Sequence, residues 1–278
     1  MQNFKLNEDF LLNNQDLTFP TLTAYGPGRF KEIGKFCNNF KINNALIVTD
    51  NGSINLPFIS DLQNLLNDSK VKSAIYSNIS PNPRDDEIDS GCKKFRDGNH
   101  DAIIAIGGGS AMDGGKAISL TVNSGVSLWD FEFEKEPPKL EMENPFPKII
   151  TIPTTAGTGA ETEVTAMVTH LEKGMKFCLW HPDARPCLAL VDPELTLKLP
   201  ANLTAWTGID AMIHAIEGFS VPMFHPLCDG SAIESLNLIS KSLYAAVEEP
   251  DNLLARGGMI VGSYLGGIAF LKGLGLVH

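Results

Sequence analysis

The chain has 278 residues, 43% hydrophobic and 20% charged, which is enough for one large globular domain or two ordinary ones. Lys and Arg total 22 against 33 Asp and Glu, and the net charge of −11 argues against binding to nucleic acid or anionic lipid, because both need a dense cationic surface. Five cysteines without CxxC spacing, and a polar stretch over residues 1–14 with no apolar secretory core, favour a soluble cytoplasmic protein.

Short β-branched runs alternate with longer amphipathic stretches over the first two thirds of the chain, which predicts an α/β layer with right-handed crossovers. The run at 102–106 is unbroken and apolar, as is typical of a strand buried on both faces of a parallel sheet. The acidic, proline-bearing segment 129–144 is expected to form an exposed loop. The predicted elements in chain order are strand 45–49, helix 58–66, strand 72–76, helix 85–97, and strands 102–106, 148–152 and 188–191.

After residue 193 the pattern changes to long helical stretches, at 203–218, 228–247 and 252–271. We therefore place a domain boundary near Leu199-Pro200, with an α/β domain over 1–199 and a helical domain over 200–278. The uncharged run 257–271 contains five glycines in 15 residues. It is too short to span a bilayer and predicts a closely packed buried helix.

A glycine-rich turn follows the strand at 102–106 and opens a helix. Gly107, Gly108 and Gly109 let the backbone approach a phosphate closely, and the free N–H groups at the start of the helix point toward the anion. Ser110 could add a hydroxyl donor or cap the helix. The GxGxxG fingerprint is not satisfied, since Met112 occupies its third glycine position, so a tight turn without a ligand stays the alternative.

A second loop, after the strand at 148–152, is rich in hydroxyl groups. Thr154, Thr155 and Thr158 offer donors suited to a second phosphate or to the edge of a ribose. The alternative is an ordinary polar loop with local Ser/Thr turns. Paired with the glycine turn, the loop favours nucleotide binding.

Asp50 ends the strand at 45–49. An acidic residue at this place can accept hydrogen bonds from an adenosine ribose and repel a 2′-phosphate, which would favour NAD over NADP. An aspartate that caps its own turn explains the position equally well.

Asp210 and His214 are four residues apart in the predicted helix 203–218, so their side chains leave the same face one turn apart. A carboxylate oxygen and an imidazole nitrogen at this spacing can share one divalent cation, and Glu217 could orient His214. The alternative is an i,i+4 surface pair. The apolar flanks indicate partial burial, where the pair needs a partner. Histidines 100, 170, 181 and 225 have no comparable spacing partners and are expected to be surface or structural residues.

These motifs together, in this order, resemble the iron-containing (group III) alcohol dehydrogenases of the dehydroquinate-synthase-like fold. The resemblance covers nearly the whole chain, and GIDAMIHAIEG followed by GLGLVH is its most specific part. The matching segments are VTD at 48–50, PNP at 81–83, GGGSAMDGGK at 107–116, PTTAGTGAE at 153–161, KF at 176–177, VDPEL at 191–195, GIDAMIHAIEG at 208–218 and GLGLVH at 273–278.

The resemblance implies a nucleotide-binding α/β domain, with a parallel sheet and flanking helices, and an all-helical carboxyl-terminal domain, with the active site in the cleft between them. It implies divalent iron, or zinc, held by one aspartate and three histidines; Asp210, His214 and His278 match these ligands and would be the catalytic residues. The family continues past His278 to a further histidine ligand, so we expect the helical domain to be incomplete relative to the family, either as a portion of a longer chain or as a truncated product. Cofactor-binding positions fall on Asp50, Asn82, Gly108, Gly109, Ser110, Thr154, Thr155, Thr158 and Lys176.

The activity that the resemblance implies is reversible hydride transfer between a small aliphatic alcohol or diol and NAD, with the aldehyde as product. The metal would act as a Lewis acid on the alcohol oxygen, and the cofactor would carry the redox step. Two alternatives stay open: a zinc-dependent polyol dehydrogenase of the glycerol type, and a non-catalytic NAD-binding truncation product. A homodimer is implied by the resemblance alone.

Overall fold

The computed structural model describes residues 12–17, 21–141, 143 and 146–273. The chain divides into two compact units. Unit 1 combines Met1–Phe30, Pro153–Glu163 and Val191–His278, and unit 2 combines Lys31–Ile152 and Val164–Leu190.

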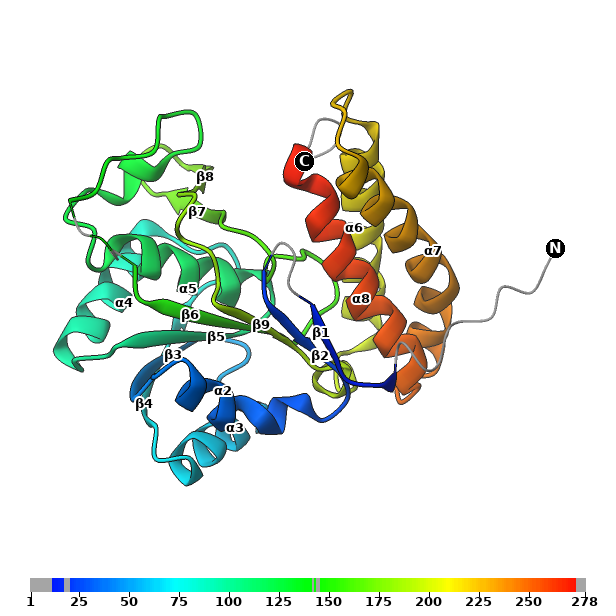
Figure 1. Ribbon diagram of the computed structural model, residues 1–278, viewed down its shortest axis with the longest axis horizontal. Helices are drawn as coiled ribbons and strands as arrows, with labels where there is room; N and C mark the ends of the chain where they lie inside the picture. Colours follow the sequence, from blue (N-terminus) through cyan, green and yellow to red (C-terminus); the bar gives the residue numbers. More distant parts are fainter. Residues whose placement is uncertain (1–11, 18–20, 142, 144–145, 274–278) are drawn as a thin grey trace. The chain divides into compact units, whose positions relative to one another are not determined.

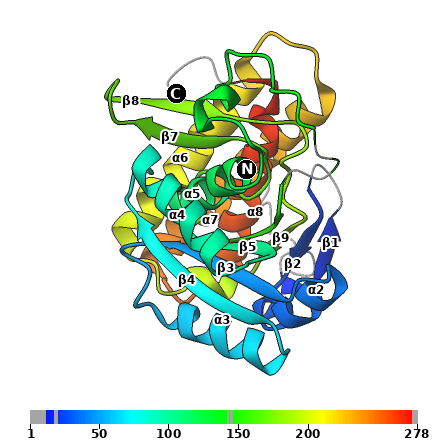
Figure 2. The same cartoon turned by 90° about the vertical axis from the view of Figure 1, so that its left-hand side faces the viewer.

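Unit 2 is an α/β layer built on a parallel arrangement of strands. The pairs β3–β4, β3–β5 and β6–β9 are parallel, and the strands follow one another in the order β9-β6-β5-β3-β4. The helices α2 and α3 lie on one face of these strands and α4 and α5 on the other (Figures 1 and 2). The bounds are α2 Ile33–Asn39, β3 Asn44–Asp50, α3 Pro57–Asp68, β4 Lys72–Ile79, α4 Asp85–Asp97, β5 Ala102–Gly107, α5 Gly109–Thr121, β6 Lys148–Pro153 and β9 Leu188–Val191.

Local sequence explains why these elements form where they do. Strand β5 is buried along its whole length, as its apolar run predicts. Helix α4 has Asp85, Asp86 and Glu87 in its first turn and basic residues in its last, so its charges complement the helix dipole at both ends. Its apolar residues at helical spacing are buried. The α/β prediction for this part of the chain is confirmed.

Some elements of the fold carry no such local signal. Strands β7 (Ala166–His170) and β8 (Met175–Leu179) form an antiparallel hairpin that the sequence analysis missed, because half-exposed residues interrupt their apolar pattern. The short antiparallel pair of β1 (Gln15–Leu17) and β2 (Thr23–Tyr25) was missed as well.

The expected exposed loop at 129–144 begins within a short 3-10 helix, η2 (Leu128–Phe131). Phe131 is buried, and its ring lies 6.1 Å from the rings of Phe146 and His181. The expectation of an exposed loop is therefore wrong at this point, because an aromatic contact between distant segments buries the side chain.

Unit 1 contains three long helices that lie side by side: α6 (Ala201–Ser220), α7 (Pro226–Glu248) and α8 (Leu253–Ala269) (Figure 1). The 3-10 helices η3 (Pro193–Thr196) and η4 (Phe270–Lys272) flank this bundle along the chain. The segment Leu253–Lys272 is long and apolar enough to cross a membrane, but 78% of its most apolar window is buried within the protein. Such burial is typical of a core helix, so the apolarity is weak evidence for a membrane span. The prediction of a buried helix here is confirmed.

Candidate cofactor and metal site

The glycine-rich turn lies at the carboxyl end of β5 and opens α5. Gly107 has a φ of +144°, and a Cβ there would lie 2.8 Å from the Ala111 Cβ and 2.9 Å from a carboxylate oxygen of Asp50. Gly108 is the N-cap of α5 and has no side chain to cap the first N–H groups of the helix. The turn is therefore a cradle that only glycine fits, at the amino end of a 13-residue helix, where an anion is favoured.

Asp50 lies beside this cradle, at the end of β3. Its carboxylate accepts hydrogen bonds from the Gly52 N–H at 2.9 Å, the Ser53 N–H at 3.0 Å and the Ser53 hydroxyl at 2.8 Å. The turn-capping alternative is thus realised. A carboxylate has about four acceptor positions, so these three bonds leave room for one from a ribose hydroxyl. The geometry of Asp50 is therefore compatible both with capping its own turn and with binding a ribose hydroxyl group.

Ser110 uses its hydroxyl group as a hydrogen-bond donor within unit 2. Its hydroxyl donates to the Pro81 carbonyl at 2.5 Å, and the N-cap of α5 is Gly108, so of the two roles considered for Ser110 the helix cap is not realised. The bond ties the glycine turn to the PNP segment, where Asn82 is exposed. Lys176 is exposed on β8, opposite Thr169 of β7.

An ion pair within α5, the helix that the glycine turn opens, was missed by the sequence analysis. Lys116 of α5 is almost completely buried, and its Nζ lies 3.6 Å from the Asp113 carboxylate. Burial raises the pKa of Asp113 to about 6, although Lys116 and Lys176 pull it down. The backbone of Met167, in β7, also lowers this pKa, so α5 and the hairpin that carries Lys176 both influence the carboxyl group. The available signal was a charged pair three residues apart in an otherwise small and apolar helix.

The threonine-rich loop belongs to unit 1 and packs on two of its helices. A Cβ at Gly157 would lie 2.8 Å from the Thr207 Cβ of α6, and one at Gly159 would lie 2.6 Å from the Gly267 Cα of α8. Within the loop Thr154 is buried, whereas Thr155 and Thr158 are partly exposed. The Thr158 hydroxyl accepts from the Ala160 N–H at 3.3 Å, so part of the loop is the local hydroxyl turn considered as the alternative.

Asp210 and His214 lie on the same face of α6, as their spacing predicts. His214 Nδ1 is 3.8 Å from Asp210 Oδ2; the His214 side chain is 8% exposed and that of Asp210 32%. The Phe270 ring lies 5.0 Å from the His214 ring. Because bonds from zinc to carboxylate oxygen or imidazole nitrogen are about 2 Å long, one cation could contact both donors. Glu217, which could orient His214, is fully buried one turn further along α6.

These two donors fit a divalent iron or zinc ion in chemical type and separation, but a metal centre needs more ligands. Within the part of the chain that the structure describes, no group of three or more His, Cys, Asp or Glu residues is gathered for a metal. His278, the predicted third ligand, lies outside the described residues.

The histidines expected to be surface or structural have structural contacts. His170 stacks on the Trp129 ring at 4.3 Å, and His225 caps α7 by accepting from the Cys228 N–H. His181 lies 3.3 Å from the Pro138 carbonyl oxygen.

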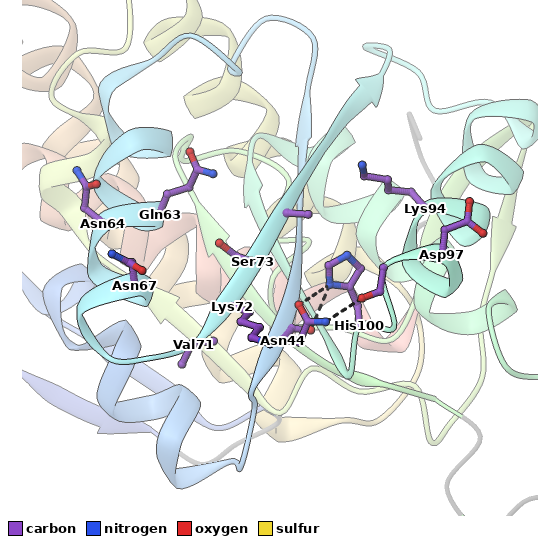
Figure 3. Close-up of a pocket in the computed structure, with 12 residues that line it drawn as sticks. Asn44, Gln63, Asn64, Asn67, Val71, Lys72, Ser73, Lys94, Asp97 and His100 are labelled. Carbon is purple, nitrogen blue, oxygen red and sulfur yellow. Dashed lines mark hydrogen bonds between the residues drawn. The ribbon is translucent and has the colours of Figure 1, made fainter.

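His100 belongs to a polar groove of about 940 Å³ in unit 2 (Figure 3). Its Nδ1 lies 3.0 Å from Oδ1 of Asn44, whose amide donates to the Gly98 carbonyl at 2.9 Å. The groove borders the amino ends of β3 and β4, and β5 also begins beside it. Because a six-residue strand is about 20 Å long, the groove is remote from the glycine turn at the other end of β5. The groove is lined by Asn44, Gln63, Asn64, Asn67, Val71, Lys72, Ser73, Ala74, Lys94, Asp97, Gly98 and His100.

The model of the iron-containing alcohol dehydrogenase family matches residues 20–193, and that of the carboxyl-terminal region of the same family matches residues 204–278. The chain belongs to the iron-containing alcohol dehydrogenase family. This confirms the resemblance on which the sequence analysis relied.

Three relatives illustrate the membership. The chain is 35% identical to the NAD-dependent methanol dehydrogenase of Bacillus methanolicus, covering 93% of this chain and 67% of that protein. It is 32% identical to the 1,3-propanediol dehydrogenase of Klebsiella pneumoniae, covering 95% and 67%. The structure of sulfoacetaldehyde reductase from Bifidobacterium kashiwanohense in complex with NAD+ is similar, with a TM-score of 0.81 and 32% identity over 93% of this chain and 66% of that one. The chain spans about two thirds of the length of these relatives.

Proposed function

We propose that this protein is an NAD-dependent alcohol dehydrogenase that moves a hydride reversibly between a small aliphatic alcohol or diol and the nicotinamide ring. The observation that carries the proposal is the Asp210–His214 pair, with donors 3.8 Å apart on one face of α6, in a chain of the iron-containing alcohol dehydrogenase family. The relatives named for methanol and 1,3-propanediol favour a short alcohol as substrate and its aldehyde as product.

Asp210, His214 and His278 are the proposed ligands of a divalent iron ion, with zinc as the alternative metal. A bound cation would supply Lewis acidity toward the alcohol oxygen. The protein's part is to hold the donors: α6 sets the Asp210–His214 spacing, and burial beside Phe270 restricts the imidazole ring.

The glycine turn is the main part of the proposed cofactor site. Backbone N–H groups of Gly108, Gly109 and Ser110 would face the pyrophosphate, and Asp50 would accept from the adenosine ribose, which favours NAD over NADP. The absence of a side-chain cap from the N-cap residue of α5, Gly108, and the remaining acceptor position of Asp50 support this assignment. The other proposed cofactor-binding residues are Asn82, Thr154, Thr155, Thr158 and Lys176.

We also propose a division of the chain into two domains. The two family matches end and begin at residues 193 and 204, which supports the division into an α/β domain at 1–199 and a helical metal-binding domain at 200–278. We also propose a cytoplasmic location and a homodimer, with a small alcohol or aldehyde as substrate and neither nucleic acid nor membrane as partner. The net charge of −11 supports this last point.

The test combines metal analysis with NAD reduction by short alcohols after loading with Fe²⁺ or Zn²⁺. Asp210→Asn and His214→Asn should lose metal and turnover while NAD still binds, because the glycine turn is unchanged. Cofactor binding by the wild-type protein without metal or turnover would support the non-catalytic alternative. Turnover with zinc and glycerol, but not with simple alcohols, would support the polyol dehydrogenase.

A further inference from the structure

Lys272 is the last residue of η4, and its side chain is only 2% exposed. A buried ammonium group is costly unless it is paired and hydrogen-bonded. The three N–H groups of a lysine can satisfy three acceptors, and Lys272 has three: the Phe219 carbonyl at 3.5 Å, the Met223 carbonyl at 3.3 Å and the Asp229 carboxylate. The charge is therefore both neutralised and fully hydrogen-bonded.

The three acceptors come from different segments of unit 1. Phe219 lies in the last turn of α6, Met223 in the loop that follows and Asp229 in the first turn of α7. The last carbonyls of a helix carry its negative dipole end and have no partner within the helix, so a cation is stabilised there. One side chain thus ties the end of α8 to both other helices of the bundle. We call Lys272 and Asp229 the clamp.

The clamp lies close in sequence to Phe270, whose ring contacts the ring of His214. A Cβ at Gly218 of α6 would lie 2.7 Å from the Ala269 carbonyl, so the backbones of α6 and α8 nearly touch at this level. Phe270 follows directly, and its ring is 5.0 Å from the His214 ring. Two residues beyond Phe270, Lys272 fixes the chain to the end of α6, the same helix that carries His214. The position of the aromatic ring and that of the clamp are therefore linked through three consecutive residues.

We propose that the Lys272–Asp229 clamp positions His214 for metal binding by holding Phe270 against its ring. Lys272 and Asp229 are positioning residues, which act through Phe270 rather than on substrate or cofactor. The inference rests on the proposed function, since it takes His214 as a metal ligand. Without the ion pair the end of α8 gains freedom, and a ligand that samples more positions loses more entropy on binding a cation.

The most direct test replaces the partly exposed partner of the clamp. Asp229→Asn keeps the shape and removes the charge, whereas Asp229→Glu keeps the charge, and the 32% exposure of the side chain leaves room for one more methylene group. Lys272→Met removes the cation itself. Lys198→Met, at an exposed lysine of the same unit, controls for the loss of a positive charge.

Two measurements separate positioning from stability. Titration with Co²⁺, followed by calorimetry and the visible spectrum of the ion, should give affinity about tenfold weaker for Asp229→Asn and Lys272→Met, as for other changes that act through a ligand's neighbours. Asp229→Glu and Lys198→Met should stay close to the wild type. In the metal-free protein, ¹⁵N-histidine NMR should show the His214 ring signals shifted in Asp229→Asn, because the Phe270 ring current is lost.

A clamp that only stabilises the fold predicts a different result. Urea unfolding of Asp229→Asn would then show a loss of stability, while the Co²⁺ affinity, the spectrum and the His214 signals would match the wild type, and the proposal would be overturned. If the wild-type protein binds no Co²⁺, the proposed function fails. The His214 signals of the folded, metal-free variants still decide the inference, since unchanged signals refute positioning. Should Lys272→Met not fold, Asp229→Asn carries the test alone.

Discussion

A methyl group at Gly267 of α8 tests how closely the threonine-rich loop is packed against the helical bundle. Its Cβ would lie 2.7 Å from the Gly159 carbonyl oxygen and 2.8 Å from Thr162 Oγ1, whereas ordinary contacts begin at 3.4 Å. The two oxygen atoms cannot move away from the added methyl group independently, because the Thr162 hydroxyl donates a hydrogen bond to the Gly159 carbonyl at 2.8 Å. The loop would therefore have to retreat by about 0.7 Å, or the helix would have to shift.

The expected magnitude follows from two opposing terms. Overpacking of a tight contact costs about 1–3 kcal/mol, while replacing glycine by alanine inside a helix stabilises by roughly 1 kcal/mol. Gly267→Ala should therefore destabilise the protein by about 1 kcal/mol or somewhat more. The matched control is Gly230→Ala in α7, where an added Cβ meets nothing within 4 Å. Only the higher helix propensity of alanine changes the stability there, so the control should be stabilised by roughly 0.5–1 kcal/mol.

Urea unfolding of both variants measures the difference, and titration with NAD measures its consequence for the cofactor. Since the displaced loop carries Thr154, Thr155 and Thr158, Gly267→Ala should also weaken NAD binding, whereas Gly230→Ala should leave it unchanged. If Gly267→Ala is as stable as Gly230→Ala and binds NAD equally well, the loop is not held at the distance described, and the packing argument is wrong.

The remaining predictions concern both units. Gly107→Ala, at a φ of +144° beside Asp50, should weaken NAD binding at least about tenfold while Co²⁺ binding is retained; equal NAD affinity would contradict the cradle. Arg256→Met removes hydrogen bonds to the Thr204 hydroxyl at 2.8 Å and to the Pro250 carbonyl at 3.0 Å. Urea titration should show a free energy of unfolding that is lower by about 2–4 kcal/mol, and a loss below about 1 kcal/mol would argue against these bonds. Burial raises the pKa of the Cys37 and Cys92 thiols to about 12, so a thiol reagent at neutral pH should label them only after unfolding; rapid labelling of the native protein would refute their burial. Burial raises the pKa of Asp113 from 3.8 to about 6, so its contribution to the free energy of unfolding is present at low pH and is lost as the pH rises through about 6. Asp113→Asn should therefore flatten the pH dependence of the free energy of unfolding between pH 3.8 and about 6. An unchanged slope would contradict the raised pKa of Asp113.

The elements that could be predicted from the sequence are those with a strong local signal. Strand β5 is an unbroken apolar run, and α4 combines apolar spacing with charges that suit both helix ends, so its predicted bounds agree with the structure. The β7–β8 hairpin has no such signal, because its stability depends on pairing between two half-exposed segments. Tertiary contacts, rather than local preference, decide structure there.

The same distinction separates the parts of the candidate site. The i,i+4 geometry of Asp210 and His214 follows from helix periodicity alone and could be predicted. The ring of Phe270 against His214 depends on how α6 packs on α8, and no spacing in the sequence reveals it. Likewise the burial of Lys116 beside Asp113 depends on the elements around α5. Helical spacing therefore predicts which side chains share a face, and packing decides what meets that face.

Asp192, a residue of one of the family motifs, has a structural role within unit 1. It belongs to the VDPEL segment that supports the resemblance, yet its buried carboxylate accepts from the backbone N–H groups of Gly28 at 3.1 Å, Phe30 at 2.9 Å and Glu194 at 3.0 Å. Burial raises the pKa of Asp192, and the three N–H donors oppose that rise. These bonds join the segment near residue 30 to the start of η3, which explains why Met1–Phe30 clusters with the helical part of the chain rather than with the strands that follow it in sequence. The aspartate of this motif is thus accounted for by the folding of unit 1.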